Sequence, residues 1–196
     1  MRNHREDVVD QALRVLDTYG LADLTMRRLA KELGVQPSAL YHHFPSKQLL
    51  LAAVADELLA RGARPQTAGG TWEERARACC TQLRDAMLAY RDGAEVVATV
   101  HAFGLGAQAP ERALADAVAG SGAAPDLVRA ATRTLLHLVF GHTLDEQTHL
   151  QAGSAGAIDD DPRDRSDLEV GVGLVLDGIR ARTAAHRPET PTSRTP

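Results

Sequence analysis

Apolar residues recur at intervals of three and four positions through most of this 196-residue chain. Near the N-terminus, for example, Val8, Ala12 and Leu16 form one stripe of a helix. No segment shows the sustained two-residue alternation that a half-buried strand requires. The periodicity therefore predicts an all-α fold, in which each helix buries an apolar face against its neighbours.

Cap residues, prolines and glycines divide this pattern into separate helices. Pro37 and Pro125 suit the first turn of a helix, Thr25 and Ser46 suit the N-caps of two others, and Gly20 and Gly34 suit the turns that end one. Capping-box pairs mark three further starts: Asn3 with Glu6, Thr71 with Glu74, and Ser166 with Glu169. With their cap residues, the expected helices span approximately residues 4–19, 25–34, 37–44, 46–62, 71–92, 94–102, 110–119, 125–151 and 166–182.

The predicted helices group into two domains. Residues 1–46 are expected to form a small three-helix domain, and residues 47–185 a larger helical domain. Within the larger domain, residues 152–165 are small, polar and charged, so we expect a mobile loop there. Residues 186–196 contain too few apolar groups to bury and are expected to be disordered.

Charge is distributed unevenly along the chain. The formal net charge of -4 argues against a protein that coats nucleic acid by bulk electrostatics. The first 48 residues nevertheless hold seven Lys and Arg against six Asp and Glu, and Glu32 is the only acid between Arg27 and Lys47. We therefore expect a local basic face on an otherwise acidic protein.

The apolar segments and the cysteines bear on where the protein resides. Runs such as 49–54 and 135–140 are far shorter than the ~18 apolar residues of a membrane span. The N-terminus lacks a signal-peptide pattern, so we expect a cytoplasmic protein without a membrane partner. Cys79 and Cys80 are adjacent, and neighbouring helical side chains point about 100° apart. Buried free thiols are therefore expected, with a redox switch as the alternative.

The segment GVQPSALYHHF, residues 34–44, predicts a short helix with a polar outer face. A glycine turn joins it to another short helix, which is the arrangement of a helix-turn-helix. In that motif the second helix enters the DNA major groove, so polar side chains on its outer face meet base edges and phosphates. The candidate DNA-binding residues are Thr25, Arg27, Arg28, Gln36, Pro37, Ser38, Ala39, Tyr41, His42, His43 and Lys47.

Residues 24–50 resemble the DNA-binding domain of the TetR family of transcriptional regulators. The resemblance rests on Leu-Thr, an Arg, Leu-Ala, Leu-Gly-Val, Leu-Tyr-x-His-Phe and Lys-x-x-Leu-Leu, a pattern that matches residues 24–50 without an insertion or deletion. It implies a homodimer with one recognition helix per subunit. It also places Tyr41, His43 and Lys47 at phosphate-contacting or helix-positioning places. The family's variable reading surface would comprise Thr25, Arg27, Gln36, Ser38, Ala39 and His42.

The segments YRDGAEVVATVHAF, HLVFGHTLDEQTHL and LEVGVGLVLDGIRA resemble the regulatory domain of the tetracycline repressors. Those proteins hold a drug-magnesium complex through a histidine and an acid, and bind the drug through an asparagine. By resemblance these places are taken here by Val97, Asp145 and Cys79. Valine cannot bind a metal, so we expect neither tetracycline sensing by that route nor a cofactor.

Three further sets of residues in the larger domain are candidate sites. His142, Asp145 and His149 recur on one helical face and could hold a divalent cation, although a hydrogen-bonded or solvated face is the alternative. Two glycines on the final helix would let a partner helix approach closely. The expected dimer interface includes Gly171, Val175 and Gly178. Candidate effector-pocket residues, for which plain core is the alternative, are Met87, Val97, His101, Phe103, His137, Phe140 and Asp145.

These observations predict a ligand-responsive DNA-binding transcriptional regulator. We expect residues 1–46 to bind DNA and residues 47–185 to bind ligand and dimerise. The protein would act as a repressor that binds a palindromic operator and is released by a small-molecule effector, although activation uses the same DNA-binding face. No Ser/His/Asp or Cys/His spacing indicates an enzyme. A helical protein-interaction module without specific DNA binding is the alternative.

Overall fold

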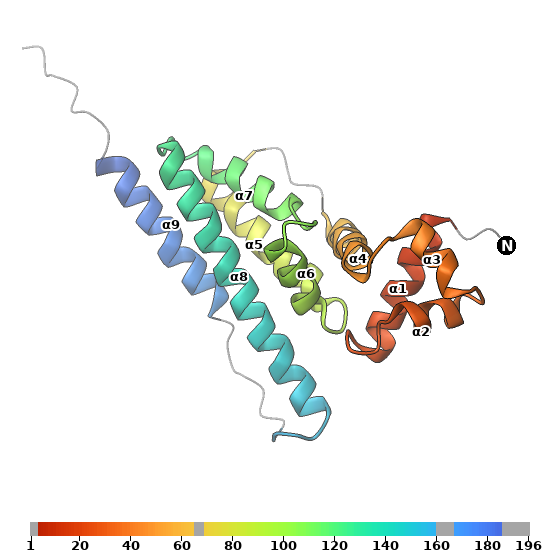
Figure 1. Ribbon diagram of the computed structural model, residues 1–196. Helices are drawn as coiled ribbons and strands as arrows, with labels where there is room; N and C mark the ends of the chain where they lie inside the picture. Colours follow the sequence, from red (N-terminus) through yellow and green to blue (C-terminus); the bar gives the residue numbers. More distant parts are fainter. Residues whose placement is uncertain (1–3, 65–68, 160–166, 186–196) are drawn as a thin grey trace, which may run out of the picture.

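The computed structural model describes residues 4–64, 69–159 and 167–185, and within these ranges all regular secondary structure is helical (Figure 1). This confirms the predicted all-α fold. The helices are α1 Arg5–Tyr19, α2 Met26–Glu32, α3 Pro37–His43, α4 Lys47–Gly62, α5 Trp72–Leu88, α6 Gly93–Ala102, α7 Ala109–Ala119, α8 Pro125–Ser154 and α9 Leu168–Ala185.

The first three helices form a small domain at one end of the molecule (Figure 1). Their amphipathic faces meet around Leu13, Leu29, Leu40 and Phe44, each of which is at most 1% exposed. Helix α4 packs on α1 and leads into the rest of the molecule. The chain therefore passes from the small domain into the larger one through a single continuous helix.

The larger domain is built around α5, which packs against α4, α6, α7, α8 and α9. The 30-residue helix α8 is the longest element, and α9 lies alongside it at the edge of the molecule far from α1–α3 (Figure 1). Leu83, Met87, Leu114 and Leu135 are at most 3% exposed and fill the space between these helices. None of the described helices combines the length and apolar composition needed to cross a bilayer.

Several predicted caps are confirmed by the hydrogen bonds at helix starts. The hydroxyl of Thr25 accepts from the backbone N–H of Arg28 at 3.1 Å, and Thr71 forms the predicted capping box with Glu74. The cap of α1 differs, because the N–H of His4 donates to Asp7 at 2.7 Å, one position later than the expected pair with Glu6. Asn3 and Ser166, the expected caps of α1 and α9, lie outside the described residues.

Two helix ends differ from the sequence prediction. Helix α5 ends at Leu88 rather than near residue 92, because the chain turns there into α6. Helix α8 continues to Ser154, so residues 152–154 of the expected mobile loop form its last turn. Residues 160–165 of that loop and the expected disordered tail, 186–196, lie outside the described residues.

Asp92 joins the two domains at the turn before α6. Its backbone is left-handed, with φ 56°, a conformation that Asp tolerates better than most residues. One carboxylate oxygen accepts from the backbone N–H of Leu21, between α1 and α2, at 2.7 Å. The other accepts from the Gln151 amide of α8 at 2.9 Å. A single side chain thus connects the small domain to the longest helix of the larger domain.

Gln147, a buried residue of α8, holds the α5–α6 turn from the inside. Its side-chain oxygen accepts from the backbone N–H of Ala94 at 3.1 Å. Its amide nitrogen donates to the carbonyls of Tyr90 at 3.0 Å and Met87 at 3.3 Å. These bonds satisfy backbone groups that the chain reversal leaves without helical partners.

Both cysteines are free and buried, which confirms the expected thiols. Burial raises the pKa of the Cys80 thiol to about 12, so this thiol stays protonated at neutral pH.

We expect Gln147→Leu to lower the free energy of unfolding by about 2–4 kcal/mol, because it leaves buried backbone groups near Ala94 and Tyr90 without partners. Leucine has a similar size, so loss of volume would not explain the change. Urea unfolding at one fixed protein concentration measures it as a lower midpoint with an unchanged slope. Thr148→Ala, on the exposed neighbouring position, serves as the control and should stay within ~0.5 kcal/mol of wild type. Equal stability of both variants would contradict this role for Gln147.

Candidate DNA-binding surface and ligand cavity

The helix-turn-helix is fixed by a few buried anchors and one glycine. Gly34 has a φ of 66°, which a side chain at this turn would strain. Pro37 occupies the first turn of α3, where its missing N–H costs no hydrogen bond. Leu40 and Phe44, each 1% exposed, anchor α3 in the small domain, and the Arg5 guanidinium lies 4.8 Å from the Phe44 ring centre. The remaining faces of α3 are thereby turned outward.

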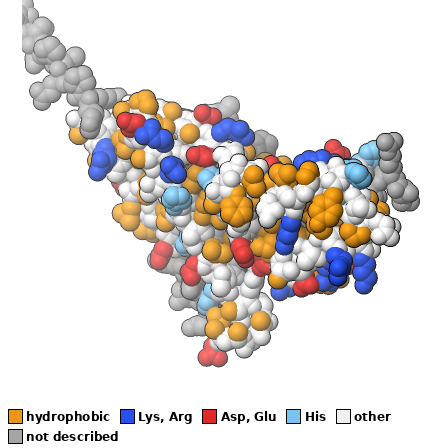
Figure 2. All heavy atoms as spheres, viewed as in Figure 1, with side chains coloured by type: hydrophobic (Ala, Val, Ile, Leu, Met, Phe, Trp, Pro, Cys, Tyr) orange, Lys and Arg blue, Asp and Glu red, His pale blue; other side chains and the backbone are white. Residues whose placement is uncertain are grey.

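Most of the predicted DNA-binding residues lie on this outward surface. Tyr41 is 49% exposed although it is aromatic. Figure 2 shows Lys and Arg side chains on the end of the molecule formed by α1–α3. Thr25, Arg27, Gln36, Ser38, Tyr41, His42 and His43 are exposed, whereas Pro37, Ala39 and Lys47 are partly exposed. We call this set the α3 surface.

Arg28 differs from the other predicted DNA-binding residues. Its guanidinium pairs with Asp23 at 2.7 Å and lies 3.6 Å from the centre of the Tyr19 ring. A guanidinium stacked on an aromatic ring and paired with a carboxylate is already held within the domain. In the structure Arg28 therefore ties α2 to the end of α1, which argues against its predicted contact with DNA.

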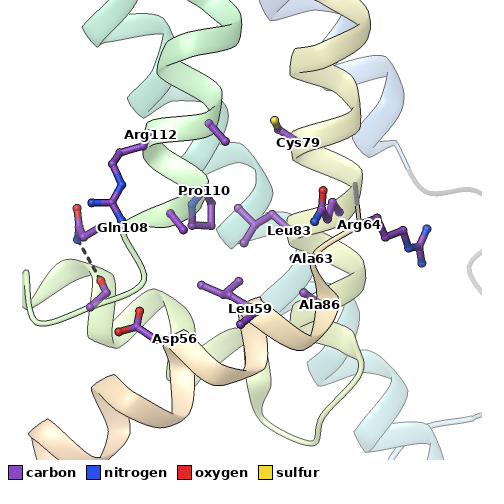
Figure 3. Close-up of a pocket in the computed structure, with 15 residues that line it drawn as sticks. Asp56, Leu59, Ala63, Arg64, Cys79, Leu83, Ala86, Gln108, Pro110 and Arg112 are labelled. Atoms are coloured by element: carbon purple, nitrogen blue, oxygen red, sulfur yellow. Dashed lines mark hydrogen bonds between the residues drawn. The ribbon is translucent and has the colours of Figure 1, made fainter. Parts of the chain in front are cut away.

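A cavity of about 520 Å³ lies between α4, α5, α7 and the loop that joins α6 to α7 (Figure 3). This volume is within the range of small-molecule sites, roughly 300–1,000 Å³. Its apolar wall includes Leu59 of α4, Leu83 of α5 and Pro110 of α7, which Figure 3 shows facing a common space. Most of the lining is apolar and a few groups are polar, as in typical ligand pockets.

The polar groups of the cavity come from α4, α5, α7 and the loop between α6 and α7. Asp56 of α4 accepts from the backbone N–H of Ala107 at 2.7 Å. The Gln108 amide donates to the carbonyl of Gly106 at 3.0 Å. Gln82 and Arg112 complete the polar lining on α5 and α7, and Arg64 lies just past the end of α4. The bond from Asp56 ties α4 directly to the rim of the cavity.

None of the predicted effector-pocket residues lines this cavity. Met87 and Val97 are 0% exposed and belong to the packed core. Phe103, which is 61% exposed, and the exposed side chains of His137 and Asp145 face outward. Only Met87 lies on a helix that lines the cavity, and it faces the core; the other predicted residues lie on α6, just after it, or on α8. Cys79 does line the cavity, at the place where the resemblance puts the drug-binding asparagine.

His101 and Phe140 form a separate cluster. The His101 ring lies edge-on to the ring of Phe140, with centroids 5.3 Å apart, and its Nε2 lies 3.1 Å from a carboxylate oxygen of Glu111. These contacts join α6, α7 and α8. They support packing and do not contribute to the cavity.

The predicted metal set is not assembled. Among the described residues, no three His, Cys, Asp or Glu side chains are placed to hold a metal ion. His142 lies 3.8 Å from Glu146, which also binds Arg84, while Asp145 is exposed. The expectation of a cation at His142, Asp145 and His149 is therefore wrong for this structure.

The predicted dimer residues have different environments. A side chain at Gly171 would meet Leu138 of the same chain at 3.3 Å, so this glycine serves packing between α8 and α9. Val175 is partly buried in the same packing. Gly178 instead faces open space, and Val170 and Leu174 on α9 are 64% and 70% exposed. The outer face of α9 is thus apolar and uncovered in the single chain.

A helix-turn-helix with a polar outer face, joined by one helix to a domain that holds a ligand-sized cavity, defines a class of DNA-binding regulators. Comparison with known proteins agrees with this class. Residues 8–54 match the family described as bacterial regulatory proteins, tetR family, and residues 64–167 match the tetracyclin repressor-like C-terminal domain. The chain belongs to the TetR family, whose members are transcriptional regulators and not enzymes.

The similar proteins include repressors and solved structures. The chain is 34% identical to the class A tetracycline repressor from transposon 1721 of Escherichia coli over 89% of both proteins. It is 42% identical to the class D repressor of Escherichia coli over 48% of this chain, and spans only 44% of that relative's length.

Mycobacterium smegmatis BioQ is a similar solved structure, with 44% identity, a TM-score of 0.84, and coverage of 91% of this chain and 98% of that one. BioQ with its double-stranded DNA operator has 42% identity, a TM-score of 0.80 and coverage of 91% and 99%. A TetR variant from Acinetobacter baumannii in complex with minocycline has 28% identity, a TM-score of 0.67 and coverage of 95% and 99%.

The contrast between Arg28 and Lys47 can be measured by salt dependence. Lys47→Met should reduce the slope of log affinity against log salt by about 1 for each subunit that binds, because each subunit loses one phosphate contact. Arg28→Met should leave that slope unchanged and lower the thermal midpoint, because its partners are Asp23 and Tyr19. Fluorescence anisotropy on duplex DNA at several salt concentrations gives both slopes. An equal reduction of the slope in the two variants would show that Arg28 also contacts DNA.

Proposed function

We propose that this protein is a repressor that binds a palindromic operator as a homodimer and is released by a small-molecule effector. The exposed polar α3 surface, held rigidly by Leu40 and Phe44, is the observation that carries the proposal. A similar protein, BioQ, has been solved with its double-stranded DNA operator. Because bacterial DNA lies in the cytoplasm, the proposal places the protein there.

On this proposal the residues of the α3 surface divide into two roles. Gln36, Ser38 and His42 would contact base edges, and Ala39 would meet a thymine methyl group. Arg27 would reach either a phosphate or a guanine edge. Thr25, Tyr41, His43 and Lys47 would contact phosphates or position α3, and so fix its register without reading sequence. Two such helices about 34 Å apart would enter successive major grooves of a palindrome.

The dimer would form through the outer faces of α8 and α9. Leu144 is 41% exposed on α8, and Val170 and Leu174 are the most exposed large apolar residues on α9. Gly141 and Gly178 face open space, so neither obstructs the approach of a partner helix. Four helices from two subunits would bury this apolar surface.

The effector would bind in the cavity beside α4. Helix α4 supplies Asp56, Leu59 and Ala60 to the wall, and its first residue is Lys47. A ligand that prefers a shifted α4 would therefore move the α3 surface away from operator spacing. Couplings of about 1–3 kcal/mol are typical of such linkage. Relatives are tetracycline repressors, but tetracycline itself is not proposed, because Val97 stands where their metal-binding histidine would be.

A protein-interaction module is the second candidate. It would use the α3 surface to dock another protein and predicts no salt-dependent binding to DNA. The local excess of Arg and Lys between Arg27 and Lys47 favours the DNA-binding proposal.

The dimer proposal predicts that Leu174→Arg weakens self-association about 10- to 100-fold, because it places a charge in an apolar helix interface. Sedimentation velocity over a concentration series measures this change. Leu105→Arg is the matched control, since Leu105 is 42% exposed but lies in the α6–α7 loop. If Leu174→Arg self-associates as tightly as Leu105→Arg, the outer face of α9 is not part of the dimer interface.

The DNA-binding proposal is tested by anisotropy on the duplex upstream of the protein's own gene, against a scrambled duplex. Tight, salt-sensitive binding that favours the native duplex supports it. Gln36→Ala should reduce the preference between native and scrambled DNA, whereas Tyr41→Ala should weaken binding to both alike. No binding to either duplex at low salt would favour the interaction module. If Gln36→Ala keeps the same preference for the native duplex, Gln36 does not contribute to base readout.

A further inference from the structure

The charged side chains around the cavity differ in whether they have an ion-pair partner. The charged residues that line it are Asp56, Arg64 and Arg112. Asp56 already accepts the N–H of Ala107, and Arg64 lies 3.6 Å from Asp85. The Arg112 guanidinium makes no ion pair with any residue in 4–64, 69–159 or 167–185. Among these described residues, Arg112 is therefore the cation of the cavity that lacks a counter-ion, whereas the carboxylate of Asp56 binds the backbone N–H of Ala107.

The position of Arg112 relates this charge to the apolar wall. Figure 3 shows its side chain on the same side of the cavity as Gln108, while Arg64 is on the opposite side and points away from Leu83. Gln108 keeps its amide carbonyl available, because its bond to Gly106 uses the amide nitrogen. The cavity thus has a polar end at Arg112 and an apolar body at Leu59, Leu83 and Pro110.

We infer that the effector is an amphipathic organic anion, with its apolar part against Leu59 and Leu83 and its anionic group at Arg112. This inference rests on the proposed effector role of the cavity. A guanidinium binds carboxylate, sulfonate or phosphate groups through charge-assisted hydrogen bonds, often in pairs. The carboxylate of Asp56 opposes a second negative charge, so a single anionic group fits better than two.

Two fluorescent probes with the same ring system test the inference. 8-Anilinonaphthalene-1-sulfonate carries one sulfonate, and N-phenyl-1-naphthylamine is its neutral counterpart. Arg112→Gln should weaken binding of the sulfonate about 5- to 10-fold and leave the neutral probe within about twofold. Arg129→Gln is the matched control, because Arg129 is exposed on α8 and pairs with Asp126 outside the cavity. Fluorescence titration of the full-length protein gives each affinity.

A variant that fills the cavity locates the probes. Ala60→Trp, at an exposed position of α4 that lines the cavity, should abolish binding of both probes. Ala113→Trp fills the same space from α7. It is used in place of Ala60→Trp if circular dichroism shows that Ala60→Trp is unfolded.

The outcomes separate this inference from the proposed function. If the cavity-filling variant no longer binds the probes, but Arg112→Gln and Arg129→Gln change the affinity for the sulfonate equally, the anion inference is overturned. The cavity then remains a ligand site. If the cavity-filling variant binds both probes as tightly as wild type, the cavity is not their binding site, and its role in the proposed function is contradicted. A preference for octylammonium over octanoate in displacing the neutral probe would also overturn the inference, because it would assign the polar end to Asp56.

Discussion

The hydrogen bonds of Asp92 hold together the parts of this molecule that must act in concert. One carboxylate binds the backbone of Leu21 in the small domain and the Gln151 side chain of α8. Such bridging requires a sharp turn, which the left-handed backbone of Asp92 and the following Gly93 provide. A side chain at Gly93 would lie 2.2 Å from the carbonyl of Met87, so only glycine allows this close approach. The relative position of the two domains depends on this turn.

Gln147 supports the same turn from the interior and makes the arrangement rigid. Buried polar groups with every partner satisfied favour one packing over its alternatives, because any shift would leave a donor or acceptor unpaired. Helix α8 therefore has two distinct faces. Its inner face fixes the α5–α6 turn through Gln147, and its outer face carries the exposed Leu144 and Gly141. In the proposed dimer, α8 would therefore link the partner subunit to the turn that contacts the small domain.

Sequence reasoning succeeded where the determining interactions are local. Thr25, Ser46 and Thr71 cap the helices that they were expected to cap, since a cap contacts only the next turn of its own chain. It did not identify the residues of the cavity, whose lining depends on how α4, α5 and α7 rotate against each other. Periodicity identifies an apolar face but not its neighbour, so Met87 in the core could not be distinguished from a pocket residue. Only the resemblance, through Cys79, indicated the correct wall.

Helix α4 explains how a cavity and a DNA-binding surface can share one response. Asp56 at the cavity and Lys47 at the small domain are nine positions apart on one uninterrupted helix, about 14 Å at 1.5 Å per residue. A helix of this length moves as a unit, because local bending would break its backbone hydrogen bonds. A displacement at Asp56 must therefore reach Lys47 or be absorbed where α1 packs on α4. The hydrogen bond between Asp92 and Leu21 tethers the turn after α1 and so opposes a shift at that packing. On the proposed function, a ligand that displaces α4 would therefore change the position of α3.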